Sequence, residues 1–160
     1  MNSQQKIKVG GILEFRNLCL IGVMSAPDKP GLVAHIFQTL GEEKLNAQFI
    51  VQSIDLNDES HVQFCVAMED MERTLAFLQP VAKELGARKI THIPSVAILS
   101  VFGPDFRERP GIAGVAFDAL ARVGINILAV STSISTISSV IKDSDFDDAL
   151  QALHHSFAFP

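Results

Sequence analysis

The stretch PGLVAHIFQTLGEEKLN, residues 30–46, has a counterpart eighty residues later in PGIAGVAFDALARVGIN, residues 110–126. Both begin with Pro-Gly, carry Phe and Leu three residues apart, and end with an aliphatic residue followed by Asn. The aliphatic positions recur at helical spacing, and Pro stands where a helix can begin without losing a hydrogen bond. Two copies are too few for a solenoid, so the repeat predicts a duplicated domain.

The segments around each stretch predict the same order of elements in both copies. The first copy is expected to have strands at 18–24, 47–55, 61–67 and 88–93, with helices from Pro30 and over 71–85. The second copy is expected to have strands at 96–102, 127–133 and 136–141, with helices from Pro110 and over 145–157. Gly86 is the expected C-cap of helix 71–85, and Pro80 is expected to kink or split it.

One strand is missing from the second copy, because only three residues follow its last helix. An unassigned strand at 7–13 would complete its sheet, and the first copy would then be inserted within the second. The predicted fold is α+β, with two ferredoxin-like βαββαβ units whose four-stranded antiparallel sheets carry helices on one face. The predicted domains are 18–93, and 7–13 joined to 95–157.

The motifs of both copies resemble a known family. Asp28-Lys29-Pro30-Gly31 followed by Leu45-Asn46 looks like an ACT domain, a common amino-acid-sensing unit. Ile125-Asn126-Ile127, Ser131-Thr132-Ser133 and the ending Ala152-Leu153-His154 are similar to the C-terminal regulatory region of aspartate kinase. The chain departs from that pattern at Gln52-Ser53 and at Ser60-His61, where the family has Q-N and T-D.

The resemblance implies that effectors bind between the loop and helix start of one ACT unit and the strand entry of another. One site would combine Asp28, Pro30, Gly31 and Gln52 with Asn126 and Ile127. A pseudo-symmetric site would combine Asn46 and Ala47 with Gly111, Ser131 and Thr132.

These residue types suit a free amino acid. The start of a helix offers unpaired backbone N–H groups and a positive dipole end to a carboxylate. Asp28 could accept the ammonium, whereas the corresponding loop of the second copy carries Arg109. The site around Asp28 is therefore the preferred one, although Pro-Gly and Asn also occur at ordinary helix starts and turns.

Other motifs are interpreted as structural. Asp143 to Asp148 begins like a calcium loop but lacks its Gly and its final Glu, so a capping box of Ser144 with Asp147 is preferred. Adjacent His154 and His155 point in different directions on a helix, so no metal site is expected. Cys19 and Cys65 lie in apolar runs and are expected to be buried, reduced thiols.

The composition narrows the function classes. A net charge of −5 without a long basic run disfavours nucleic acid and anionic membranes as partners. No apolar run reaches the roughly 20 residues of a membrane helix, and the N-terminus lacks a secretory signal, so a cytoplasmic protein is expected. No phosphate loop, nucleophile–base pair or cofactor motif is found, so no catalytic residue or cofactor is predicted.

The predicted function is an amino-acid-binding regulatory module of lysine or other amino-acid biosynthesis. It would be a subunit or a fragment of an aspartate kinase, with lysine or threonine as effector and a kinase catalytic subunit as partner. A homodimer is expected, because ACT units pair side by side along exposed strand edges. Two alternatives stay open: an interaction module that binds no small ligand, and a small enzyme of unrecognised class.

Overall fold

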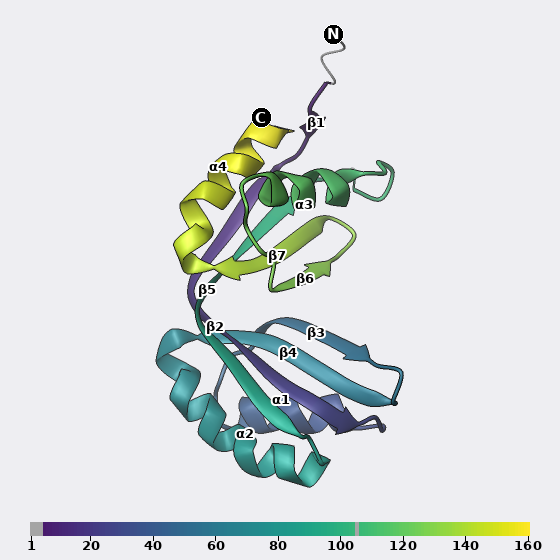
Figure 1. Ribbon diagram of the computed structural model, residues 1–160, viewed down its shortest axis with the longest axis vertical. Helices are drawn as coiled ribbons and strands as arrows, with labels where there is room; N and C mark the ends of the chain where they lie inside the picture. Colours follow the sequence, from purple (N-terminus) through teal and green to yellow (C-terminus); the bar gives the residue numbers. More distant parts are fainter. Residues whose placement is uncertain (1–4, 105) are drawn as a thin grey trace. The chain divides into compact units, whose positions relative to one another are not determined.

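Two segments of the chain fold as separate units in the computed structural model, which describes residues 5–104 and 106–160. Unit 2 is Asn17–Ser95, and unit 1 joins the N-terminal segment up to Arg16 to Val96–Pro160. Each unit contains both strands and helices, and its helices lie together on one side of its strands (Figure 1). The α+β class predicted from the sequence is confirmed.

Unit 2 contains the first copy of the repeat. Its elements are the end of β2 (Gly11–Pro27), α1 (Leu32–Glu42), β3 (Gln48–Ile54), β4 (Glu59–Ala67), the short η1 (Met68–Asp70), α2 (Met71–Leu85) and the start of β5 (Lys89–Phe102). The strand order is β3-β4-β2-β5, and both ladders of β4 are antiparallel. This order is the ferredoxin-like arrangement. Helix α2 continues through Pro80, so the split expected there as an alternative to a kink is wrong. Gly86 is the C-cap of α2 and has a left-handed backbone, as predicted.

The core of unit 2 lies between its helices and one face of its sheet. Alternate residues of a strand point to the same face, and Cys19, Ile21 and Val23 of β2 are buried together with Leu32 and Ile36 of α1. The same cluster includes Leu78, Val81 and Leu85 of α2, so both helices cover one face. Burying a side chain of this size stabilises the fold by roughly 1.5–3 kcal/mol.

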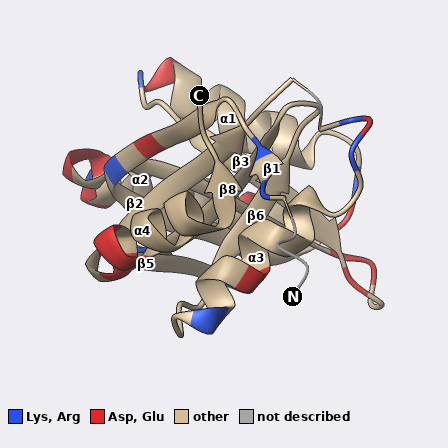
Figure 2. Cartoon of the chain, turned by 90° about the horizontal axis from the view of Figure 1, so that it is seen from above, with Lys and Arg blue, Asp and Glu red and all other residues tan. Residues whose placement is uncertain are grey.

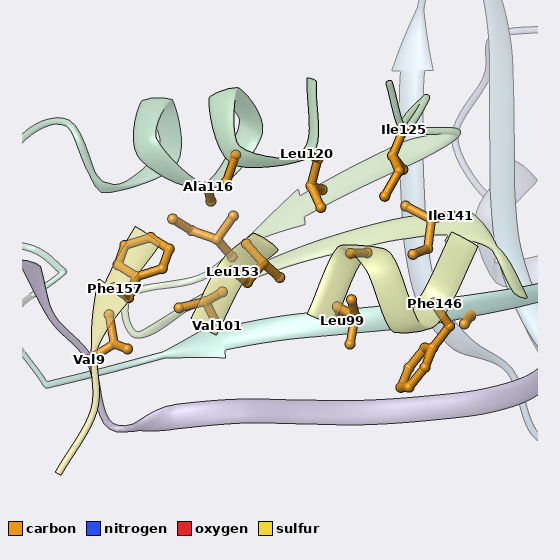
Figure 3. Close-up of a cluster of buried hydrophobic side chains, with 14 of the residues drawn as sticks. Val9, Leu99, Val101, Ala116, Leu120, Ile125, Ile141, Phe146, Leu153 and Phe157 are labelled. Carbon is orange, nitrogen blue, oxygen red and sulfur yellow. The ribbon is translucent and has the colours of Figure 1, made fainter. Parts of the chain in front are cut away.

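Unit 1 contains the second copy. Its elements are β1 (Ile7–Lys8), the start of β2, the end of β5, α3 (Ile112–Arg122), β6 (Ala129–Thr132), β7 (Thr136–Lys142), η2 (Asp143–Asp145), α4 (Phe146–Ser156) and β8 (Phe157–Ala158). Its strand order is β2-β5-β7-β6, with β7 antiparallel to both neighbours. Its core packs Leu99 and Val101 of β5 against Ala116 and Leu120 of α3 and Leu153 of α4 (Figure 3).

The structure corrects four predicted strands, 7–13, 18–24, 88–93 and 96–102. The expected strand 7–13 divides: Ile7 and Lys8 pair in parallel with Phe157 and Ala158, and a new strand begins at Gly11. That strand runs on through 18–24 as β2, and 88–93 joins 96–102 as β5, so two pairs of expected strands are each one strand. The main sheet residues therefore form six strands rather than eight, because β2 and β5 each belong to both units.

The expected capping box of Ser144 with Asp147 is wrong. The N-cap of α4 is Asp145, and no side chain caps it. Acidic residues do gather at the start of α4 (Figure 2). One of them, Asp143, accepts two hydrogen bonds from Arg16, at 2.9 Å from Nε and 2.8 Å from Nη2. The Arg16 guanidinium also lies 4.2 Å from the centre of the Phe146 ring, so it joins β2 to the start of α4.

The Arg16–Asp143 pair predicts a pH-dependent contribution to stability. The hydrogen bonds from Arg16 lower the pKa of Asp143 below its ordinary 3.8. A carboxyl group whose pKa is lower in the folded state stabilises the protein at pH values above its ordinary pKa. This stabilisation is lost as pH falls through the folded-state pKa. Asp143→Asn should therefore lower the melting temperature at pH 7, and the difference from wild type should shrink below pH 3.8. Arg16→Lys keeps the positive charge but cannot form the two parallel hydrogen bonds to Asp143, so it should lose part of this stabilisation. If Asp143→Asn lowers the melting temperature equally at pH 7 and at about pH 2.5, this prediction is wrong.

Both cysteines are buried and free, as predicted. Burial raises the pKa of Cys19, and burial together with the neighbouring Cys19 raises the pKa of Cys65 to about 12. Because the thiolate is the reactive form, a disulfide reagent at about pH 8 should label native protein far more slowly than unfolded protein. Cys65→Ala should leave one slow thiol. Rapid labelling of two thiols in the native protein would show that the burial is wrong.

Candidate functional site

The starts of α1 and α3 have the same unusual geometry. Each helix begins after a glycine, Gly31 or Gly111, with φ of 90° and 92° respectively. This left-handed backbone strains any residue that has a side chain, which explains the glycine at both positions. Neither helix has a side-chain N-cap among the described residues. In α1 the N–H of Leu32 donates to the carbonyl of Lys29 at 3.4 Å, and the remaining N–H groups of each first turn are available to an acceptor from outside the helix.

Space is open in front of both glycines. A Cβ built on Gly31 or Gly111 would meet no heavy atom of the described residues within 4 Å. The two glycines thus turn the chain into the helix and leave the approach to the first turn open.

A pocket of about 290 Å³ lies at the start of α3, entirely within unit 1. Its lining residues are Phe106, Arg109, Pro110, Gly111, Ile112, Ala113, Thr132, Ser133 and Ile137. Two of the residues predicted for the second site, Gly111 and Thr132, thus line one pocket. Ser131, predicted for the same site, is half-buried on β6 and does not line it. The exposed Arg109 adds a cation beside the open helix start, which favours an anionic group there.

The hydroxyl of Ser133 is already engaged. Its oxygen accepts the N–H of Thr136 at 3.1 Å and lies 2.8 Å from the Thr136 hydroxyl. These contacts close the short turn between β6 and β7. Ser133 therefore shapes the wall of the pocket, while Thr132 and Arg109 supply side-chain groups to it.

In unit 2 the loop before α1 is attached to the turn between β3 and β4. The backbone N–H of Asp28 donates to the carbonyl of Asp58 at 2.9 Å, and the Asp28 side chain is exposed. Gln52, predicted to line the same site, donates its side-chain amide to the hydroxyl of Ser60 at 2.8 Å. Its amide N–H is thus partly committed to the sheet.

A hydrogen-bonded histidine in unit 2 was missed by sequence reasoning. Nδ1 of His61 lies 3.1 Å from the backbone nitrogen of Ser25, and its Nε2 lies 2.9 Å from Oδ2 of Asp55. The other carboxylate oxygen of Asp55 accepts the N–H groups of Asn57 and Glu59 at 2.8 and 3.1 Å. The hydrogen bond from His61, followed by those two N–H groups, lowers the pKa of Asp55.

The strand-entry residues of both predicted sites occupy equivalent places in the two units. Asn46 and Asn126 are exposed just before β3 and β6, and Ala47 and Ile127 beside them are half-buried. Each predicted site takes its helix start from one unit and its strand entry from the other. The structure describes these halves one unit at a time, so their pairing stays a prediction.

Two larger hollows in unit 1 lie along α3 and α4. One, of about 480 Å³, is lined by residues of these helices and the turns that follow them, including Arg122, Asp148 and His155. The other, of about 640 Å³, adds Lys6 and Gly111. Both are open, and Arg122 is paired with Asp118 at 2.7 Å. Of the predicted site residues, Gly111 lines the second hollow, and the others lie outside both.

Residues 5–104 and 106–160 lack two kinds of feature. They contain no group of three or more His, Cys, Asp or Glu side chains placed to hold a metal ion. None of their helices has the length and apolar character needed to cross a membrane.

Comparison with known proteins identifies the family. A family model described as ACT domain matches residues 99–157. The aspartokinase of Mycolicibacterium smegmatis is 30% identical over 149 residues, covering 92% of this chain and 35% of that protein. The aspartokinase of Thermus thermophilus is 33% identical over 139 residues, covering 86% and 34%. This chain thus spans about a third of the length of these relatives.

Solved regulatory subunits match over nearly their whole length. The regulatory subunit of aspartate kinase from Thermus flavus is 30% identical, with a TM-score of 0.85, and the match covers 94% of this chain and 99% of that one. A structure of aspartokinase alpha and beta subunits is also 30% identical, with a TM-score of 0.84 and coverage of 92% and 97%. The chain therefore belongs to the aspartate kinase family, as one of its ACT-domain regulatory regions.

Proposed function

We propose that this chain is an amino-acid-binding regulatory module and that lysine or threonine is its effector. The main support is the pocket at the start of α3. Arg109, Thr132 and the open first turn after Gly111 all line it. An amino-acid carboxylate would accept hydrogen bonds from the free N–H groups and from Arg109. Thr132 would donate or accept a further hydrogen bond.

The second half of each proposed site comes from the strand entry of another unit. Asn46 and Ala47 would close the pocket at Gly111, and Asn126 and Ile127 would close the site at Asp28 and Gly31. The two sites differ in charge, because Asp28 offers a carboxylate where the other loop offers Arg109. We therefore assign the ammonium of the effector to Asp28 at the first site, and the carboxylate to Arg109 at the second.

The proposal assigns two ACT units to the chain. The match to the ACT family model falls within unit 1, and unit 2 repeats its strand order. We propose that residues 18–93 form a second ACT unit inserted into a first one made of 7–13 and 95–157. A related structure contains aspartokinase alpha and beta subunits, which supports a kinase catalytic subunit as the partner that receives the signal.

A homodimer is the proposed assembly, and the edge of unit 2 supports it. Strand β3 is the terminal strand of its sheet, and Ile50 and Ile54 on it are 47% and 54% exposed. Leu56, in the turn that follows, is fully exposed. An exposed apolar edge is the type of surface that a second chain covers by pairing.

Calorimetry with lysine, threonine and the other natural amino acids tests the ligand proposal. At least one should bind with a Kd below about 1 mM. Arg109→Gln should weaken that binding about 10- to 100-fold, because it removes a charged hydrogen bond of about 1.5–3 kcal/mol. Arg107→Gln is the matched control, since it removes the same charge from the same loop at a residue outside the pocket.

Two results would count against this function. If no amino acid binds at millimolar concentration, the chain would fit the alternative of an interaction module without a small ligand. If both arginine variants weaken binding equally, the effect would come from the charge of the loop, and the pocket would not be the site.

Light scattering tests the dimer. The wild type should have twice the monomer mass, and Ile54→Lys should shift it toward monomer by placing a charge on the pairing edge. Val123→Lys is the control, because Val123 is equally apolar and 51% exposed but lies just after α3. If the wild type is a monomer, the proposed homodimer is wrong. If both variants dissociate, the edge of β3 has no specific role in the dimer.

A further inference from the structure

His61 completes an irregular place in the sheet of unit 2. The pairing of β2 with β4 shifts register between Val23 and Ala26, which marks a β-bulge. A bulge leaves an extra residue outside the regular ladder. Here Met24 and Ser25 together stand opposite His61. Ser25 has a left-handed backbone with φ of 55° and gives its N–H to Nδ1 of His61. The imidazole thus replaces the strand carbonyl that the bulge takes away.

The hydrogen bonds define the tautomer of His61. Nδ1 faces a backbone N–H, so it must be the unprotonated acceptor. The proton is then on Nε2, which donates to Asp55 at 2.9 Å. Asp55 in turn receives the N–H groups of Asn57 and Glu59, so the ring is connected to the whole turn between β3 and β4.

This chain of contacts ends at the proposed effector loop. Ser25 lies three residues before Asp28, whose N–H donates to Asp58 of the same turn. Between these two residues, Ala26 and Pro27 end β2 and pair with Ser60 and Glu59 of β4. His61 therefore holds the bulge at Ser25, and Asp58 holds Asp28 just beyond the end of the strand. A change at His61 would remove the side-chain contact of the bulge, while the ladder and the contact at Asp28 remain.

We propose that His61 is a positioning residue that fastens the bulge of β2 at Ser25 to the β3–β4 turn, so that protonation of its ring loosens the segment that leads to Asp28 and weakens effector binding. This inference rests on the proposed function, because it concerns the site around Asp28. A proton on Nδ1 would face the N–H of Ser25, and two donors cannot bond to each other. Ser25 would lose the partner that compensates for its left-handed backbone.

The charged groups near His61 lie on β3, β4 and the segments around them. Asp55 beside the end of β3 is the carboxylate in direct contact with the ring, 2.9 Å from Nε2. Asp58 in the β3–β4 turn and Asp28 after β2 are further acidic residues of the neighbouring segments. Glu59 on β4 is paired with Arg88 near the start of β5, so much of its charge is compensated. A histidine side chain in general changes charge between about pH 5 and pH 8, which sets the pH range of the test.

Two substitutions separate the halves of the contact. His61→Asn places an amide oxygen near the position of Nδ1 and keeps an acceptor for Ser25, but it cannot be protonated. His61→Gln places an amide near the position of Nε2 and keeps a donor for Asp55 but leaves Ser25 unpaired. His35→Gln is the control, because His35 of the same unit pairs with Glu84 on the helices, at 2.9 Å.

The experiment measures two quantities at about pH 8 and about pH 5.5. The first is the protection factor of the Ser25 amide in hydrogen exchange without ligand, and the second is the Kd of lysine and of threonine. In wild type and His35→Gln, the protection factor should fall and the Kd should rise, each about fivefold or more, at the lower pH. In His61→Asn this pH dependence should vanish. In His61→Gln the protection factor should be low and effector binding weak at both pH values. Melting temperatures establish that every variant is folded.

The two claims fail separately. If wild-type Ser25 protection is the same at both pH values, or if His61→Asn keeps the wild-type pH dependence, the fastening by His61 is overturned. If neither amino acid binds wild type at either pH, the proposed function is overturned, and the Ser25 protection factor alone decides whether His61 holds the bulge.

Discussion

The left-handed glycine before each first helix is the constraint on which both the fold and the site depend. Gly31 and Gly111 turn the chain from a loop into a helix at nearly the same φ, and each is followed at once by a buried residue, Leu32 or Ile112. The first turn is thereby fixed against the core while its N–H groups stay uncapped. A capping Ser or Asp would stabilise the helix by about 1 kcal/mol but would occupy those groups. The glycine thus leaves a binding surface where a capping residue would close it.

The sequence predicted the helices more accurately than the strands, for a physical reason. Helix 71–85 is found at its predicted bounds, because its apolar spacing and Gly86 are local features. The fusion of strands into β2 and β5 has no such local feature. Asn17 and Ser95, where these strands pass between units, both have a left-handed backbone, and Glu14 to Asn17 looks like a polar loop. Only partners distant in sequence, such as Asp143 for Arg16, explain why that segment is a strand.

The candidate site was predictable to the extent that its parts repeat. Pro-Gly and Asn were found because they occur twice, and Gly111 with Thr132 line one pocket. Arg109 was noticed only as a difference in charge between the copies, although it lines that pocket. His61 was noted only as a departure from a motif. Its role requires a bulge in β2, an acid at the end of β3 and the ring on β4, and no spacing in one sequence reveals that three segments meet.

The two copies close their equivalent turns with different chemistry. In unit 1 the turn after β6 is short, and the hydroxyls of Ser133 and Thr136 close it. In unit 2 the turn is longer, and Asp55 and His61 close it and extend its contacts to the loop before α1. Hydroxyl pairs and a histidine–carboxylate pair are different means to the same end, because each gives the backbone N–H groups of a turn their acceptors. Duplication has therefore preserved the helix start in both units, while the side chains that close the turn beside it have diverged.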